Sequence, residues 1–449
     1  MDDGHFLVYL CWEKSPSGLS LVSDLTMATR YSAPRGTQDI LPDTSHLWQH
    51  VESRWREICH LYGYREVRTP MFEETELFVR SIGEVTDIVS KEMYTFEDRA
   101  GRSLTLKPEG TAPVVRAYLE HNLHASGGVA RLYYITPIFR YERPQKGRYR
   151  QAHQLGAEIL GAVSPVADAE LLAMLLHFFR TLGIPDERIE LHLNTIGCRQ
   201  CRPAYREAVQ AFGREHLAAL CAACRERVER NPLRLLDCKV PTCQAVRAQA
   251  PAIDPYLCDG CRAHFEGLLA LLKSLDLPYV RDDRLVRGFD YYTRTTFEVL
   301  AQGLGAQNAL CGGGRYDGLV EECGGPPTPA LGVAIGIERT LIVLQELGAP
   351  LPEPPKPLAF VIAIGEAARP VALQLAQQLR AANISVDLDL EGRSPKAQMR
   401  LADRSGARYA IILGDQELSS GTATLRNLHT HEQHTLPQSQ LPTVLNMHR

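Results

Sequence analysis

Apolar residues recur at helical spacing in the first clearly patterned segment of the chain, residues 46–62. The apolar positions of this segment are Leu47, Val51, Trp55, Ile58 and Tyr62. They place one apolar face opposite a charged one, which predicts an amphipathic helix. Gly63 ends the pattern, and residues 64–70 predict a strand that ends at a proline.

Later segments change between strand-like and helical patterns. Residues 103–106 indicate a strand, and residues 131–160 contain two strand-like runs around a polar loop, which is typical of an antiparallel hairpin. Residues 166–183 have the period of a helix. Residues 287–295 (RGFDYYTRT) lie between apolar runs and indicate a strand, and residues 331–339 indicate a small-residue strand that leads into a helix.

Two further regions differ from this β-rich part. Residues 190–275 are rich in Arg and Ala, are mostly helical in pattern, and interrupt two β-rich segments as an insertion would. Residues 348–357 are dense in proline and predict a semi-rigid linker. The last region predicts a small α/β domain with a parallel-leaning sheet, from alternating strand and helix patterns at 358–364, 366–382, 384–390, 394–405 and 408–413.

Composition limits the class of protein. The chain has 449 residues, which suggests two to four domains, and its 45% hydrophobic and 23% charged residues are typical of a globular protein. A formal charge of −4 argues against a generally basic nucleic-acid coat but not against a local RNA-binding surface. No apolar run is long enough to cross a bilayer.

The N-terminus does not have the pattern of a secretory signal. Acidic Asp2 and Asp3 precede a short apolar stretch at 6–12, where a signal would carry positive charge. Met27 is a second plausible start. We therefore expect residues 1–26 to be an extension or a disordered tail, and the protein to be cytoplasmic.

Paired cysteines are concentrated in the insertion. Eight cysteines there form the pairs Cys198/Cys201, Cys221/Cys224, Cys238/Cys243 and Cys258/Cys261. Such spacing in a cytoplasmic protein suggests up to two structural zinc sites, because four thiolates complete a tetrahedral ion. The alternative is a set of reduced thiols without metal. The remaining cysteines, Cys11, Cys59, Cys311 and Cys323, have no pairing pattern and are expected to be ordinary residues.

Four motifs carry a family resemblance. Residues 106–111 (LKPEGT), residues 139–144 (FRYERP) with the basic loop to 150 and residues 153–158 (HQLGAE), and residues 331–339 (LGVAIGIER) together resemble the class II aminoacyl-tRNA synthetases. Residues 287–292 (RGFDYY) make the resemblance specific to the bacterial type of the histidyl-tRNA synthetase family. Taken alone, that last motif is also compatible with a hairpin that carries an exposed ion pair.

The resemblance implies a fold and a domain plan. The expected class is an α+β catalytic domain with an antiparallel sheet of the class II type, a helical insertion and a C-terminal α/β anticodon-binding domain. The corresponding segments are 27–189 and 276–346 for the catalytic domain, 190–275 for the insertion, 347–357 for the linker and 358–449 for the anticodon-binding domain. The unit at 46–70 resembles the motif that builds a homodimer interface, although a helix on a sheet edge would have the same pattern.

The implied reaction is attack of a histidine carboxylate on the α-phosphorus of ATP, and then transfer of histidine to the 3′ end of histidine tRNA. This chemistry needs positioning and cations rather than a protein nucleophile. By resemblance Arg140 binds the α-phosphate and the histidine carboxylate, and Arg287 replaces a metal used by other class II enzymes. The implied ATP contacts are those of Arg140, Glu142, Arg148 and Arg339, with Mg²⁺ accompanying ATP.

The implied histidine site contains an ammonium-binding part and an imidazole-binding part. Glu109, Thr111 and Gln154 are expected at the amino group, together with Arg140 and Arg287 at the carboxylate. Glu158 and Tyr292 are expected at the two ring nitrogens, with Tyr291 as a wall. One departure is Ala152, where the family often has an aromatic residue suited to stacking on adenine.

Histidine tRNA, ATP and L-histidine are the expected partners of a homodimer, with no membrane or DNA partner. Candidate tRNA contacts are Lys146, Arg148 and Arg150 in the basic loop, and Arg393, Lys396 and Arg400 near a C-terminal helix, which is equally compatible with a solvated helix start. One alternative function is a non-catalytic paralogue that binds histidine and regulates histidine biosynthesis. Another is a sensor of uncharged tRNA, although no kinase-like segment is present.

Overall fold

An eight-stranded sheet forms the centre of the protein in this computed structural model, which describes residues 31–83, 86, 88–302 and 309–447. The expected extension 1–26 and the alternative start Met27 lie outside the described residues. The strands run in the order β1 (Arg65–Glu66), β5 (Ala130–Phe139), β6 (Gln151–Leu160), β11 (Ala330–Gly336), β10 (Ala309–Arg315), β9 (Thr293–Ala301), β7 (Ile189–Thr195) and β8 (Val280–Arg281). All pairs from β5 to β7 are antiparallel, and only the two edge strands pair in parallel.

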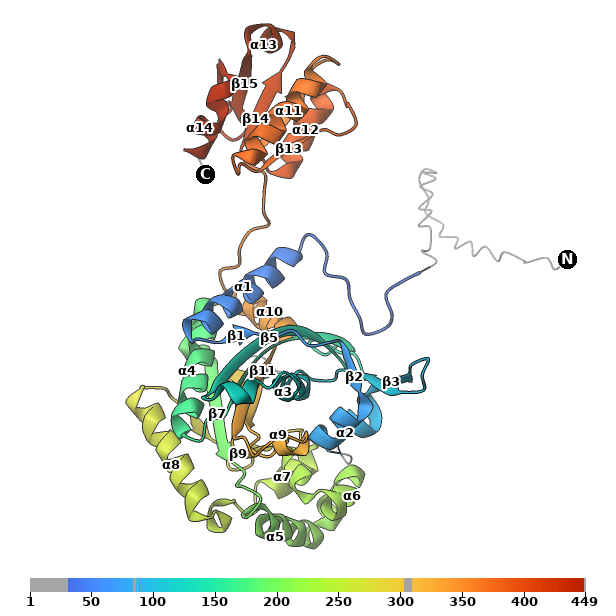
Figure 1. Ribbon diagram of the computed structural model, residues 1–449, viewed down its shortest axis with the longest axis vertical. Coiled ribbons are helices and arrows are strands. Elements are labelled where there is room, and N and C mark those ends of the chain that lie inside the picture. Colours follow the sequence, from blue (N-terminus) through green and yellow to red (C-terminus); the bar gives the residue numbers. More distant parts are fainter. Residues whose placement is uncertain (1–30, 84–85, 87, 303–308, 448–449) are drawn as a thin grey trace, which may run out of the picture.

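Helices cover one face of this sheet and build the main hydrophobic core (Figure 1). They are α1 (Ser45–Leu61), α4 (Pro165–Thr181), α8 (Asp259–Ser274) and α10 (Ile337–Glu346). The predicted helix at 46–62 is α1, and its Trp55 packs edge-on against Phe178 of α4 with ring centroids 5.0 Å apart. Alternate strand residues face this core, as the two-residue period of a strand requires.

The opposite face of the sheet carries smaller elements and leaves room for a cleft. Here lie α2 (Thr75–Ile82), α3 (Thr111–Glu120), α9 (Leu319–Glu322) and a small antiparallel sheet of β2 (Phe72–Glu74), β4 (Ser103–Leu106) and β3 (Tyr94–Glu97). The predicted hairpin is β5–β6, whose register pairs Thr136 with Gln154 and Leu132 with Glu158. The two halves of the second motif therefore lie on adjacent strands.

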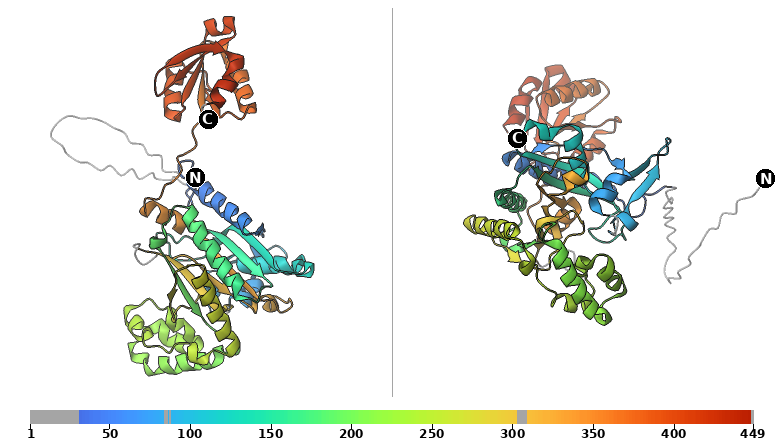
Figure 2. Two further views of the ribbon diagram at one scale, coloured as in Figure 1. Left: turned by 90° about the vertical axis from the view of Figure 1, so that its left-hand side faces the viewer. Right: turned by 60° about the horizontal axis from the view of Figure 1, so that its bottom comes forward.

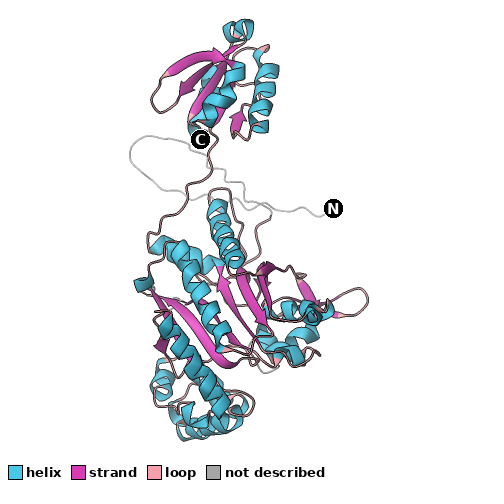
Figure 3. Cartoon of the chain, turned by 60° about the vertical axis from the view of Figure 1, so that its left-hand side comes forward, coloured by secondary structure: helices cyan, strands magenta, loops and turns pink. Residues whose placement is uncertain are grey.

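The insertion lies at one end of the sheet, where Figures 2 and 3 show its helices as a separate group. Its helices are α5 (Arg202–Glu215), α6 (Ala222–Arg230) and α7 (Pro241–Arg247), with a 3₁₀ turn, η5 (Pro232–Asp237), between the last two. The segment 190–275 also contains parts of the catalytic framework. Most of β7 lies in this segment and pairs with β9 in the central sheet, and Phe265 and Leu268 of α8 lie in the main core.

The prediction of a strand over 287–295 is wrong for its first part. Residues 287–292 form a turn, and β9 begins only at Thr293. The aromatic side chains explain this, because Phe289 stacks on Tyr291 with ring centroids 5.1 Å apart instead of alternating across a sheet. The backbone N–H of Asp290 donates to the carbonyl of Ile82 in α2 rather than to a neighbouring strand.

The C-terminal region has its own sheet and its own cores. Its strands run in the order β13 (Val386–Leu388), β12 (Ala359–Ala363), β14 (Tyr409–Leu413), β15 (Thr422–Asn427) and β16 (Gln433–Pro437). Its helices are α11 (Ala368–Ala381), α12 (Pro395–Ser405), α13 (Asp415–Ser420) and α14 (Leu441–Asn446). The first three strands are parallel, as predicted, and residues 349–357 join this unit to α10 without helix or strand. Within the described residues, no helix is long and apolar enough to cross a membrane.

Candidate functional site

One cleft on the open face of the central sheet brings most of the expected site residues together. The expected residues that line it are Glu109, Thr111, Arg140, Glu142, Arg148, Gln154, Arg287, Tyr291, Tyr292 and Arg339. They come from segments as distant in sequence as the start of α3 and the start of α10. Glu158 is the exception, because it lies one layer behind the cleft wall with 0% exposure.

Arginines form one side of the cleft. The Nε of Arg140 donates to the carbonyl oxygen of Pro108 at 2.7 Å, and Arg148 lies 3.5 Å from the carboxylate of Glu142. Arg339, in the first turn of α10, donates to the carbonyl oxygen of Gly147 at 3.1 Å. Burial and the neighbouring Arg148 lower the pKa of Arg339. Such a concentration of cations favours a polyanion such as a triphosphate.

Arg287 is held from two sides. Its Nη1 donates to Glu298 of β9 at 3.0 Å, and its guanidinium lies directly over Gly312 of β10, where a Cβ atom would collide with it. Gly312 and Glu298 are partners in the β9–β10 register. Sequence reasoning missed both supporting residues. The available signal was a lone carboxylate in the apolar strand 296–300 and the glycine run that follows.

Phenols and carboxylates form the deep end of the cleft. Thr111 and Tyr134 donate to Oε1 of Glu158 at 2.9 and 3.1 Å, and Tyr316 donates to Oε2. Burial raises the pKa of Glu158 to about 8, although these hydrogen bonds oppose the shift. Glu158 therefore organises two phenols and a hydroxyl, of which Thr111 and Tyr316 line the cleft. Tyr316 was not expected from the sequence.

Glu109 is bound at the start of α3. Its carboxylate accepts hydrogen bonds from the backbone N–H of Thr111 at 2.6 Å and of Ala112 at 2.8 Å. Burial raises the pKa of Glu109, and these two N–H groups act against the shift. The carboxylate is thus fixed in place at the cleft wall, with a geometry suited to a cationic ligand.

Three buried polar atoms of cleft residues have no hydrogen-bond partner among the described protein atoms. They are Nε of Arg148, Oε1 of Gln154 and Nε of Arg287. Buried polar atoms almost always have a hydrogen-bond partner, so buried atoms without one in a cleft indicate groups that bind a polar ligand. Near Gln154, the side chain of His153 is instead bound to the buried carboxylate of Glu338 at 3.0 Å.

The expected adenine wall lacks an aromatic group at Ala152, which does line the cleft. Phe289 also lines it, with the guanidinium of Arg140 5.7 Å above its ring. The expected tRNA contacts do not form one patch. Lys146 pairs with Glu346, Arg148 lines the cleft and Arg150 lies over the ring of Tyr141, whereas the other three candidates belong to the C-terminal region.

The eight insertion cysteines gather into two groups, each with ligand atoms within 4.8 Å of one another. The groups are Cys198, Cys201, Cys258 and Cys261, and Cys221, Cys224, Cys238 and Cys243. Outside these groups, Cys59 is buried in the core and Cys311 lines the cleft.

The chain matches the family model of histidyl-tRNA synthetase over residues 36–340 and that of the anticodon binding domain over residues 359–448. It is 50% identical to a histidine--tRNA ligase of Caldanaerobacter subterraneus over 89% of this chain and 96% of that protein. It is 51% identical to a histidine--tRNA ligase of Pelotomaculum thermopropionicum, over 89% and 94% of the two chains.

The solved structure of S. aureus histidyl-tRNA synthetase superimposes with a TM-score of 0.79 at 37% identity, covering 92% of this chain and 99% of that one. A protein described as an ATP phosphoribosyltransferase regulatory subunit/histidyl-tRNA synthetase from Bacillus halodurans has a similar fold at 23% identity. The family model and the long matches agree with the motifs gathered in the cleft. The chain therefore belongs to the histidyl-tRNA synthetase family of class II aminoacyl-tRNA synthetases.

Proposed function

We propose that this protein ligates L-histidine to histidine tRNA in two steps. The histidine carboxylate attacks the α-phosphorus of ATP, which forms histidyl-adenylate and releases pyrophosphate. A terminal ribose hydroxyl of the tRNA then attacks the activated carbonyl, and AMP leaves. The observation that carries this proposal is the convergence of Arg140, Arg287 and Arg339 on one cleft that ends in buried phenols and carboxylates.

In the first step the arginines would do most of the electrostatic work. Arg140 and Arg287 would hold the histidine carboxylate and the α-phosphate, where negative charge is redistributed as the new bond forms. Arg148 and Arg339 would bind the outer phosphates, and Glu142 would accept from the adenine amino group. The carboxylates of Glu298 and Glu338, which also contact Arg287 and His153, would be the cleft oxygen atoms able to hold a Mg²⁺ that accompanies ATP, and the ion would supply charge neutralisation at the phosphates.

Histidine would be selected by the deep end of the cleft. Glu109, Thr111 and Gln154 would bind the ammonium group, and Tyr292 would face the imidazole with Tyr291 as a wall. The position of Glu158 behind Thr111 and Tyr316 supports an indirect role, in which it orients the Thr111 hydroxyl for the ammonium group and the Tyr316 hydroxyl for the ring. A site that must satisfy these groups rejects apolar analogues, which leave them unpaired.

The assembled enzyme is proposed to be a cytoplasmic homodimer that binds tRNA through its C-terminal domain. The regulatory alternative has less support, because this chain keeps Arg140, Arg287 and Arg339 in one cleft and also carries the anticodon-binding region.

Histidine-dependent exchange of pyrophosphate into ATP tests the first step without tRNA. Arg287→Ala is expected to abolish exchange, because it removes the buried cation and leaves Glu298 unpaired in the cleft. Arg99→Ala, at an exposed turn remote from the cleft, is the matched control and should exchange like the unchanged protein. A folded, unchanged protein that shows no histidine-dependent exchange would refute the catalytic assignment.

A further inference from the structure

The two cysteine groups of the insertion are assembled by nested pairing. The outer pairs, Cys198/Cys201 and Cys258/Cys261, form the first group, which we call cluster one. The inner pairs at 221/224 and 238/243 form the second, cluster two. The sequence spacing was compatible with several combinations of these pairs, and the fold selects this one.

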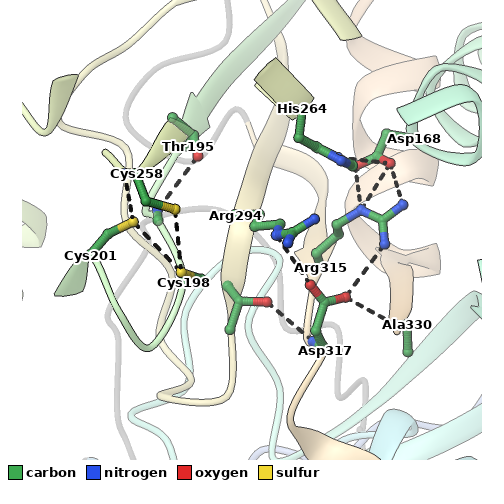
Figure 4. A network of polar contacts seen from close by, with 12 residues as sticks. Asp168, Thr195, Cys198, Cys201, Cys258, His264, Arg294, Arg315, Asp317 and Ala330 are labelled. Atoms are coloured by element: carbon green, nitrogen blue, oxygen red, sulfur yellow. Dashed lines mark hydrogen bonds and ion pairs between the residues drawn. The ribbon is translucent and has the colours of Figure 1, made fainter. Parts of the chain in front are cut away.

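The sulfur positions match a single tetrahedral ion in each cluster. With metal–sulfur bonds of about 2.3 Å, a tetrahedron has sulfur–sulfur edges of about 3.8 Å. The Sγ of Cys198 lies 3.6 Å from that of Cys201 and 3.9 Å from that of Cys258 (Figure 4). In cluster two, the Sγ atoms of Cys221 and Cys238 are 3.9 Å apart.

Backbone amides support the thiolates in both clusters. The N–H of Cys258 donates to Sγ of Cys201 at 3.1 Å, and the N–H of Cys221 donates to Sγ of Cys243 at 3.2 Å. Such bonds stabilise the negative charge that a metal-bound sulfur retains. Four sulfur ligands without any oxygen ligand favour a soft or borderline ion over magnesium or calcium. A compact set within 4.8 Å suits one ion better than a larger iron–sulfur cluster.

Cluster one is directly connected to the turn that carries Tyr291 and Tyr292. Arg202 follows Cys201 at the start of α5, and its Nη1 donates to the carbonyl oxygens of Asp290 at 3.2 Å and Tyr292 at 2.9 Å. An ion that fixes the position of Cys201 therefore also fixes the backbone of Arg202, whose side chain holds this turn.

Cluster two is connected to the same turn through η5, which lies between Cys224 and Cys238. Arg234 of η5 donates to the carbonyl oxygen of Arg287 at 3.1 Å. Asn231, which precedes η5, donates to the carboxylate of Asp290 at 3.2 Å. Both clusters thus flank segments that make hydrogen bonds to residues 287–292.

We propose that the insertion holds two zinc ions, one in each four-cysteine cluster, and that they fasten the insertion to the turn 287–292 of the cleft. Each site has four sulfur ligands and no open position, so the ions are structural. Their contribution to the reaction is to keep the turn in its binding geometry.

Metal content tests the first half of this proposal independently of activity. The full chain, expressed with zinc and purified without chelator, is expected to hold two zinc ions per chain by elemental analysis. Cys258→Ser and Cys238→Ser should each remove one ion. Cys323→Ser, which lies outside both clusters, should keep both.

Two outcomes overturn the zinc assignment. They are the absence of stoichiometric metal from the unchanged protein, and iron in place of zinc. If the serine variants do not fold, titration of the unchanged protein with a mercurial thiol reagent replaces them. Release of two ions as the cluster thiols react supports the proposal, and reaction of all the thiols without zinc release contradicts it.

The second half, fastening of the turn, rests on the proposed function. Cys258→Ser is expected to raise KM for histidine about tenfold, the equivalent of one lost charge-assisted hydrogen bond, with a smaller rise in KM for ATP, because Arg287 is the one residue of the turn assigned to the α-phosphate. Equal KM values for histidine with and without the ion would overturn the fastening while leaving the metal sites intact. Failure of the unchanged protein to exchange pyrophosphate would refute the proposed function and not the zinc sites, because metal content is measured separately.

Discussion

Two charged side chains, that of Arg287 in the cleft and that of Glu158 behind it, have room because the residue facing each of them is a glycine. A Cβ atom at Gly312 would collide with the guanidinium of Arg287, and one at Gly332 would collide with the carboxylate of Glu158. Both glycines lie in the central sheet, where a glycine otherwise weakens a strand. Their presence is explained by the charged groups that need the space.

Gly312→Ala should therefore impair catalysis by displacing Arg287. A misplacement of about 1 Å is enough to lower kcat/KM about 100-fold. Steady-state exchange kinetics and a thermal melt together measure this. Arg99→Ala, at the exposed turn remote from the cleft, is again the control. Full activity of a folded Gly312→Ala protein would contradict the positioning role of this glycine.

The raised pKa of Glu158 makes the free energy of unfolding decrease as pH rises. Its pKa is about 8 in the folded protein against the usual 4.5, so the folded state holds a proton that the unfolded state loses. This stabilisation is fully present below pH 4.5 and is lost as pH rises through about 8, with a slope of up to about 1.4 kcal/mol per pH unit.

Melting temperatures across that pH range test this assignment. The unchanged protein should melt at lower temperature as pH rises, and Glu158→Gln, which is neutral at every pH, should show a flatter profile. Parallel profiles for the two proteins would mean that other groups cause the dependence.

At the scale of elements, a buried ion pair joins parts that are distant in sequence. Arg315 at the end of β10 binds Asp168 of α4 through Nε at 2.9 Å and also through Nη2 at 2.6 Å, and both side chains are almost completely buried (Figure 4). His264 of α8 lies 3.4 Å from the same carboxylate. One carboxylate thus holds the sheet, the long helix α4 and the helix that follows the insertion.

Asp168→Ala is expected to lower the free energy of unfolding by about 3–5 kcal/mol, because it removes the buried carboxylate partner of Arg315 and leaves only the more distant Asp317, at 3.4 Å, as an ionic partner. The exposed pair of Arg54 and Glu57 supplies the contrast, and Glu57→Ala should change stability by less than about 1 kcal/mol. Denaturant unfolding of both variants and of the unchanged protein measures the two losses of stability. Similar small effects from the two changes would show that the buried pair is dispensable.

At the scale of the whole molecule, the protein has two sets of cores joined by a proline-rich linker. None of the residues that line the cleft comes from the C-terminal region, which has its own hydrophobic clusters around α11, β12 and β14. Adenylate formation and tRNA capture are therefore expected to be separable.

A chain that ends after the linker, at residue 357, should keep histidine-dependent exchange close to that of the full chain. Its apparent affinity for tRNA should fall about 100-fold or more, because one of two linked binding surfaces is lost. Exchange and aminoacylation assays on the same preparation measure the two effects. Unchanged charging of tRNA would show that the C-terminal domain is not needed for capture.

Most elements could be predicted from periodicity, including α1, the β5–β6 hairpin and the alternating strands and helices after residue 357. The spacing of apolar residues involves only residues that are close together in the chain, so it can be recognised without the structure. The turn at 287–292 could not be predicted in this way, because ring stacking and contacts with α2, α5 and η5 override the strand pattern. The supporting residues Glu298, Gly312 and Tyr316 were missed for the same reason, since they act only through partners brought close by the fold.

The sequence by itself determined the order of the elements, the family and the residue types of the cleft. Motifs and hydrophobic periods involve only residues that are neighbours along the chain, so they can be recognised without the fold. Only the tertiary structure decided which cysteines share a cluster, that Glu158 lies behind the cleft wall, and that Arg287 rests on Gly312 against Glu298. Each of these depends on distances between residues far apart in the chain, which strand register and helix packing set and residue spacing does not.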